Sequence, residues 1–107
     1  MKIKTNQLTG AALDWAVTKI EAERKLFTIY PQYITPYSTD WAQGGPIIER
    51  EKIGFKYTGA ALDFVAWVNG QLSTKHDKYG ETPLIAAMRC YVASKLGDEI
   101  EIPEELK

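Results

Sequence analysis

The sequence contains very little of the chemistry on which most enzyme and metal sites depend. It has one cysteine, Cys90, and one histidine, His76, in 107 residues. A single cysteine excludes an intramolecular disulfide and fits a reducing, cytoplasmic environment. The two residues offer no close metal-ligand spacing, so a structural zinc site is not expected. We therefore expect no metal and no cofactor.

Long apolar runs and an excess of either charge are also missing. Thirteen basic residues stand against fourteen acidic ones, so the formal net charge of -1 gives no general attraction to nucleic acid or an anionic membrane. No apolar run approaches the roughly 20 residues that span a bilayer, and the residues after the first lysines are not expected to be a secretory signal. A hydrophobic content of 45% is that of an ordinary globular protein, and residues 1–107 predict a single domain.

The clearest element is a helix over residues 83–96. Thr82 is a suitable N-cap, and Pro83 fits the first helical position. Gly97 suits the left-handed residue that often ends a helix. An apolar stripe lies beside a stripe of small residues, so we predict that this is the core helix.

A second helix is predicted to begin after Thr9. Its apolar residues repeat at helical spacing, with Leu8 and Leu13 placed as a hydrophobic staple. Acidic and basic residues at its far end, Glu21 among them, are expected to be solvated. The apolar residues are Leu13, Ala16, Val17 and Ile20, and the charged ones are Glu21, Glu23, Arg24 and Lys25.

Prolines and glycines interrupt the middle of the chain. Pro31 and Pro36 predict a long connection over residues 26–40 with at most edge-strand pieces. A helix-start signal at residues 38–41 is weakened by two glycines and a proline, so we predict a helix that restarts at Pro46 and covers residues 47–52. The charged residues of that helix, Glu49, Arg50, Glu51 and Lys52, are expected to face water.

A β-hairpin is predicted around Asn69-Gly70, a pair that favours a two-residue turn. That register places Trp67 opposite Leu72 and Val65 opposite Thr74. Both faces carry apolar residues, so the hairpin is expected to lie between helices. Residues 55–57 are expected to add a third strand, and residues 2–4 and 100–102 to be short extended pieces. The predicted fold is α+β, with a small antiparallel sheet sandwiched between helices.

The string Thr-Gly-Ala-Ala-Leu-Asp occurs twice, at residues 9–14 and 58–63. The first copy leads into a helical pattern and the second into an alternating one. We interpret the identity as chance, with tertiary context giving the copies different structures. A short helix at the second copy is the alternative, and strand, loop and helix all stay open there.

Two segments resemble a known family. Residues 37–51, YSTDWAQGGPIIERE, and residues 80–94, GETPLIAAMRCYVAS, strongly resemble the NinX-like family of small proteins from lambdoid phages and enterobacterial prophages. The opening, residues 2–17, also looks like that family's N-terminus. A more distant similarity is to phage domains described as an α–β–α sandwich. The resemblance implies a phage or prophage context in the bacterial cytoplasm, but it supplies no activity.

No catalytic residue is predicted. Cys90 stands in the middle of a helix among alanines, where a cysteine usually packs as a small apolar side chain. His76 is expected to be a solvated loop residue. Residues 43–46 lack the Gly-Lys-Ser/Thr ending of a phosphate-binding loop. Glu49 and Glu51 point to different sides of a helix, so they do not form an acid–base pair.

The three tryptophans, Trp15, Trp41 and Trp67, are the more informative residues. Core or boundary packing is the more common role, while an exposed Trp41 would form a recognition surface, since tryptophan and arginine anchor many interfaces. The leading hypothesis is a non-enzymatic phage accessory protein that binds a host or phage protein or self-associates. A nucleic-acid-associated factor is the alternative, and a small-molecule enzyme comes third. The candidate partner surface consists of Tyr37, Asp40, Trp41, Gln43 and Arg50.

Overall fold

The helices and strands were assigned from a computed structural model, which describes residues 1–25, 34–59, 64–68 and 78–106. Among these residues, two small antiparallel sheets accompany three helices, so the α+β class is confirmed. The helices are α1 (Gly10–Lys25), α2 (Trp41–Glu51) and α3 (Pro83–Leu96). A two-stranded sheet pairs β1 (Lys2–Lys4) with β5 (Glu99–Glu101), and a three-stranded sheet has β2 (Gly54–Tyr57), β3 (Phe64–Trp67) and β4 (Lys78–Gly80) in that order.

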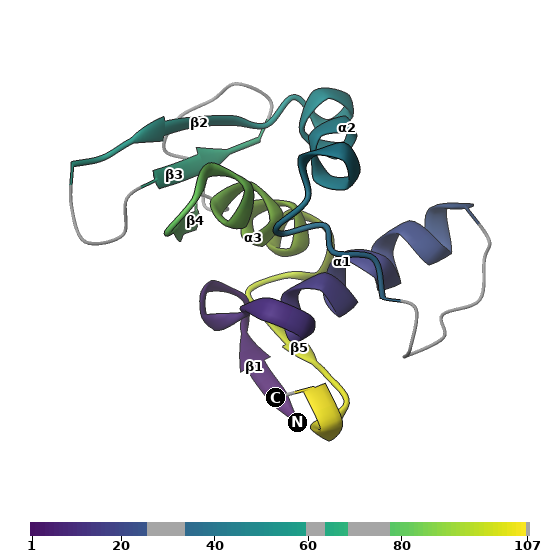
Figure 1. Cartoon of the computed structure of the whole chain (residues 1–107). Coiled ribbons are helices and arrows are strands. Elements are labelled where there is room, and N and C mark those ends of the chain that lie inside the picture. Colours follow the sequence, from purple (N-terminus) through teal and green to yellow (C-terminus); the bar gives the residue numbers. More distant parts are fainter. Residues whose placement is uncertain (26–33, 60–63, 69–77, 107) are drawn as a thin grey trace.

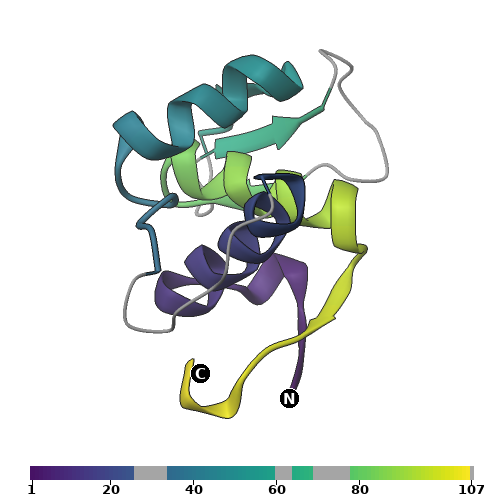
Figure 2. The same cartoon turned by 90° about the vertical axis from the view of Figure 1, so that its right-hand side faces the viewer.

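The elements are stacked with α3 in the middle (Figure 1). In Figure 1, β2, β3 and α2 lie above α3 and β4 lies beside one end of it, and in Figure 2 α1 and the β1–β5 pair lie below α3. The sheet is therefore an outer layer, rather than the layer between helices that its two apolar faces indicated. Its strands contact mainly α3.

The prediction of α3 as the core helix is confirmed. Thr82 Oγ1 accepts the backbone N–H of Ile85 at 3.0 Å, and Gly97 follows the helix with a φ of 92°. Burial is wider than the predicted stripe, because residues on almost every side of the helix are enclosed by the sheet, α1 and α2. The buried residues are Leu84, Ala86, Ala87, Met88, Cys90, Tyr91, Val92 and Ala93.

Helix α2 differs from its prediction, because it is continuous from Trp41 rather than restarting at Pro46. Asp40 Oδ1 caps its start by accepting the N–H of Ala42 at 2.9 Å. Gly44 lets the helix pack closely, since a Cβ there would lie 2.6 Å from Leu84 Cδ1 and 2.5 Å from a backbone oxygen. Tertiary packing thus outweighs the low helix propensity of the two glycines and the proline.

The predicted register of β3 is also wrong. Val65 pairs with Tyr79 rather than with Thr74, and Phe64 pairs with Gly80. A Cβ at Gly80 would lie 2.6 Å from the backbone nitrogen of Ala86, so the packing of β4 on α3 sets the register. The expected turn at Asn69-Gly70 lies outside the described residues. The third strand is confirmed as β2.

Both ends of the chain meet in the β1–β5 pair. Ile3 pairs with Ile100, and a lysine–glutamate pair flanks them on each side. The short extended pieces at both ends are thereby confirmed. Residues 60–63 lie outside the described part, so the conformation of the second Thr-Gly-Ala-Ala-Leu-Asp copy stays a prediction. None of the described helices has the length and apolar character needed to cross a membrane.

Candidate binding surface

Large aromatic side chains lie exposed on neighbouring parts of α2 and β2. Phe55 and Tyr57 alternate along β2 and so project from the same face of the sheet. Trp41 comes from the first turn of α2, and its ring centroid lies 6.1 Å from that of Phe55. Tyr57 makes an edge contact with Phe64 at 5.7 Å. We call Trp41, Phe55 and Tyr57 the aromatic row.

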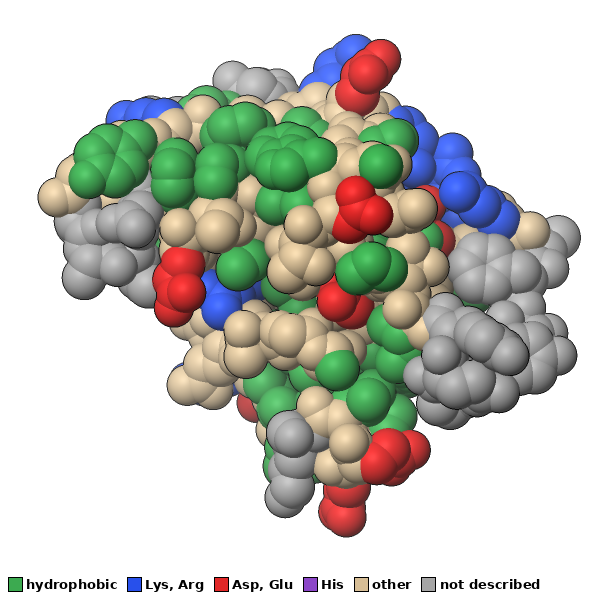
Figure 3. All heavy atoms as spheres, viewed as in Figure 1, with side chains coloured by type: hydrophobic (Ala, Val, Ile, Leu, Met, Phe, Trp, Pro, Cys, Tyr) green, Lys and Arg blue, Asp and Glu red, His purple; other side chains and the backbone are tan. Residues whose placement is uncertain are grey.

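The aromatic row is accessible to a partner. Trp41 is 50% exposed, Phe55 38% and Tyr57 65%. Figure 3 shows hydrophobic side chains as a band across the upper part of this face, over β2 and α2. Exposed apolar residues scattered singly are ordinary, whereas a contiguous group of aromatic side chains is typical of an interaction site.

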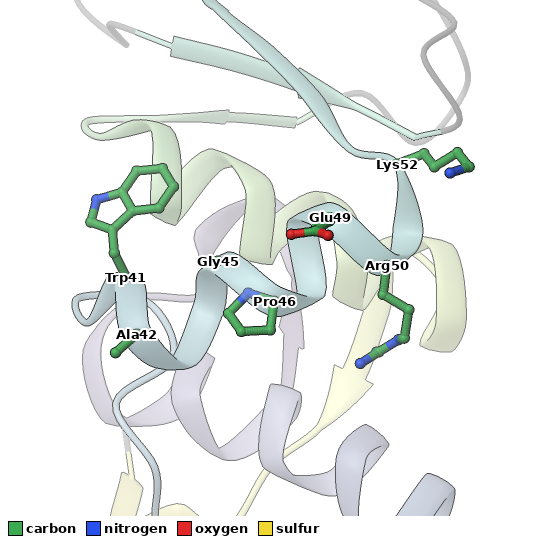
Figure 4. A pocket seen from close by; sticks show the side chains of 7 residues that line it. All are labelled: Trp41, Ala42, Gly45, Pro46, Glu49, Arg50 and Lys52. Atoms are coloured by element: carbon green, nitrogen blue, oxygen red, sulfur yellow. The ribbon is translucent and has the colours of Figure 1, made fainter.

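A groove runs along the outer side of α2 next to this row. Its volume is about 740 Å³. Figure 4 shows Trp41 near one end of the helix and Arg50 and Lys52 near the other, with Pro46 between them. The lining residues are Trp41, Ala42, Gly45, Pro46, Glu49, Arg50 and Lys52.

A buried polar cluster holds the other end of α2. Glu21 of α1 is only 1% exposed, although its charge predicted a solvated position. Its Oε2 accepts an N–H from Arg50 Nη2 at 2.9 Å and the hydroxyl of Tyr91 at 2.6 Å. Arg50 Nη2 also donates to the Tyr91 hydroxyl at 2.8 Å. We call Glu21, Arg50 and Tyr91 the buried triad, and each member comes from a different helix.

The spacing of residues along α1 indicates that Glu21 lies on the buried side of the helix. Glu21 follows Val17 by four residues, as Val17 follows Leu13, so all three project from one side of α1. Both preceding residues are fully buried. Charge type alone therefore gave the wrong expectation for Glu21.

Glu51 extends the cluster towards the surface. It accepts from Arg50 Nε at 2.9 Å and pairs with Lys95 at 3.2 Å. Burial by itself would raise the pKa of Glu51, but hydrogen bonds from Arg50 and Lys95 outweigh it and hold the pKa below its ordinary value. Burial raises the pKa of the Tyr91 hydroxyl, and the nearby Glu21 carboxylate adds to the effect. The cluster is thus arranged with Arg50 charged, Glu51 ionised and Tyr91 neutral.

The structure separates the five residues of the candidate partner surface. Trp41 and Gln43 are exposed on α2, and Asp40 caps that helix. Tyr37 is only 7% exposed, and the Arg50 guanidinium is directed at Glu21 and Glu51. Trp41 therefore lies beside aromatic residues of β2 rather than beside Arg50.

Phe55 and Tyr57 are the surface residues that the sequence reasoning missed. Both belong to the strand that the sequence predicts over residues 55–57. Their alternation around Lys56 was the available signal, because a lysine in a short strand is typical of an exposed edge.

No side chain of the described part forms an evident catalytic pair. Cys90 is fully buried in the middle of α3. His76 lies outside the described residues. Within residues 1–25, 34–59, 64–68 and 78–106, no group of three histidine, cysteine or acidic residues is placed to hold a metal ion.

Comparison with known protein families places this arrangement in a phage context. A family model described as "Bacteriophage P22, NinX" matches residues 30–95. The chain belongs to the NinX family. The matched NinX region includes α2, the three-stranded sheet and nearly all of α3, and therefore the whole aromatic row. Glu21 lies outside it, whereas Arg50 and Tyr91 lie within it. A comparison with curated proteins found no match.

Proposed function

We propose that this phage protein is a non-enzymatic accessory factor that binds a protein partner in the bacterial cytoplasm. The observation that carries the proposal is the aromatic row, three exposed aromatic side chains from two elements with Trp41 and Phe55 in contact. Aromatic residues supply large apolar area at small entropic cost, and tryptophan and tyrosine are enriched among binding hot spots. The groove along α2 gives such a partner a concave surface next to the row.

The alternative of a nucleic-acid-associated factor has less support. The formal net charge is -1, and the arginine of α2 is engaged with two carboxylates. Nucleic-acid binding depends on cations that are available to neutralise phosphates. We therefore favour a protein partner.

The test is recovery of a partner from phage-infected cells with purified, tagged protein. Trp41→Ala is the test variant, and Tyr79→Ser is its control because Tyr79 is an equally exposed aromatic residue on β4, away from the row. We expect the wild type and Tyr79→Ser to recover the same protein, and Trp41→Ala to recover at least about ten-fold less, the loss of one hot-spot side chain. Each variant must keep the wild-type circular dichroism spectrum and melting temperature.

A direct measurement then decides the proposal. The recovered protein, purified on its own, should bind the wild type and Tyr79→Ser with equal affinity in titration calorimetry. Equal binding by Trp41→Ala would contradict the proposed site. Salt-sensitive binding of DNA or RNA at near-physiological ionic strength, with no protein recovered, would instead support the nucleic-acid alternative.

A further inference from the structure

We infer that the partner presents an extended segment of alternating acidic and apolar residues, which adds to the free edge of β2 as a further strand. The inference rests on the proposed function, because the same aromatic row supplies the apolar contacts.

The first observation is the open edge of β2. In the described part, β2 is the end strand of the order β2–β3–β4 and pairs only with β3. Among the described residues, therefore, no strand lies beside one row of its backbone N–H and C=O groups. Such an edge is a template for another strand, and this main-chain pairing is a recurrent mode of peptide binding.

The second observation is the separation of side chains onto two faces. Phe55 and Tyr57 project from one face of the sheet, and Lys56 projects from the other. A strand added beside β2 would place alternate side chains next to each of these faces. Apolar residues would then contact the aromatic row, and acidic residues would lie beside Lys56.

The charge around the edge selects an acidic partner. Residues 52–57 include Lys52 and Lys56 and no acidic residue. Both lysines are exposed, and within the described residues neither has an ion-pair partner. An acidic residue across from Lys56 would provide the opposite charge at the strand edge.

The protein already contains one pairing of this type. In the β1–β5 sheet, Lys2 lies opposite Glu101 and Lys4 lies opposite Glu99, while Ile3 meets Ile100 on the other face. A strand of alternating lysine and apolar residues thus pairs with a strand of alternating glutamate and apolar residues. β2 also alternates lysine with apolar residues, but in the opposite order: β1 has an apolar residue between two lysines, whereas β2 has Lys56 between Phe55 and Tyr57.

The experiment uses the full chain and a soluble peptide of alternating glutamate and isoleucine, the pattern of residues 99–102. We expect the peptide to bind the wild type, as measured by NMR shifts of the β2 amides at residues 54–57. A lysine–isoleucine peptide should bind at least about ten-fold more weakly, because like charges then face Lys56. Lys56→Glu should reverse this preference, whereas Lys19→Glu, an equal charge change on α1, should not.

Backbone methylation distinguishes strand addition from general apolar contact. In an extended peptide, the N–H groups of the glutamates point to one edge and those of the isoleucines to the other. Methylating one of these two sets should weaken binding at least about ten-fold, and methylating the other should leave it unchanged. Both peptides keep every side chain, so equal binding by the two would overturn strand addition.

The remaining outcomes keep the two proposals apart. If neither methylated peptide differs from the parent while partner recovery still depends on Trp41, the proposed function stands and the strand inference is wrong. If recovery is indifferent to Trp41, the proposed function is wrong. If the wild type alone forms a dimer by sedimentation and protects its own β2 amides from exchange, a second copy occupies the edge and the peptide inference is overturned.

Discussion

The two ends of α2 contrast in how they use their side chains. Near its C-terminal end, Arg50 is enclosed with Glu21 and Tyr91 in the buried triad. At its N-terminal end, Trp41 is half exposed beside Phe55. The charged Arg50 side chain is 27% exposed whereas the apolar Trp41 is 50% exposed, the reverse of the usual distribution. The comparison indicates that the triad fixes the helix in place and that the row is available for contact.

The expected contributions to stability of the buried triad and the aromatic row agree with these two roles. A buried ion pair contributes little net stability relative to a well-packed apolar group, but it is costly to break because one charge is left unpaired. The buried triad therefore specifies how α1, α2 and α3 meet. Within the described part of the chain, the aromatic row makes no such polar contacts, and its side chains are between 38% and 65% exposed.

Removing one member of the triad should have the largest effect. Arg50→Met removes the closer of the two cations beside the buried Glu21 carboxylate and leaves only the exposed Lys25, at 3.8 Å, so we expect a loss of about 3 kcal/mol in the free energy of unfolding. Urea unfolding followed by circular dichroism measures it. Trp41→Ala, at the other end of the same helix, should cost less than about 1 kcal/mol.

A compensating variant sharpens this comparison. Replacing the whole triad, Glu21→Leu with Arg50→Met and Tyr91→Phe, should regain most of the lost stability, because no buried charge is left unpaired. A single Arg50→Met protein as stable as the wild type would show that the triad does not hold α2.

The adjacent glycines of α2 should respond in opposite directions to the same substitution. Gly44→Ala places a methyl group against Leu84 and a backbone oxygen, and we expect a loss of about 1–3 kcal/mol. Gly45→Ala meets only Trp41 Cε3, at an ordinary 3.8 Å, and should gain about 0.5–1 kcal/mol from helix propensity. Thermal unfolding of both variants measures the difference. Equal melting temperatures would mean that α2 does not pack closely on α3 at Gly44.

Glu51 should give the smallest effect, and one that depends on pH. Its folded-state pKa is lowered, so its contribution is present above its unfolded pKa of about 4.3 and is lost as pH falls through the folded value. We expect Glu51→Gln to be about 1 kcal/mol less stable than the wild type at pH 7, with the difference shrinking towards pH 3.

The control for Glu51→Gln is Glu49→Gln on the exposed side of the same helix. Unfolding free energies at pH 7, 5, 4 and 3 should change by less than about 0.5 kcal/mol for this control. A difference between Glu51→Gln and the wild type that stays constant over this range would argue against a stabilising role of the ionised carboxylate.

The sequence predicted those elements whose local signals agree with their packing. Thr82, Pro83 and Gly97 mark the ends of α3, and the structure places the helix between them. The apolar spacing of α1 likewise predicted its buried side. Local preference and tertiary environment point to the same conformation in both helices.

Predictions were wrong where contacts distant in sequence decide the outcome. The start of α2 depends on the space that Gly44 leaves for Leu84, forty residues later in the chain. The register of β3 depends on Gly80 against the backbone of α3. Glu21 is buried because Arg50 and Tyr91 come from other helices. The aromatic row was missed for a similar reason, since Trp41 and Phe55 meet only in the folded chain.

The β1–β5 pair has a consequence for the order of folding. Lys2 and Glu101 are nearly a full chain length apart, and Thr5 also bonds across that separation to the oxygens of Gly97 and Asp98. Contacts between such distant residues carry the largest loop-closure entropy and form slowly. During synthesis, β1 must therefore wait for almost the whole chain before it can pair. We expect α2, the sheet and α3 to assemble first, with the paired ends closing the structure last.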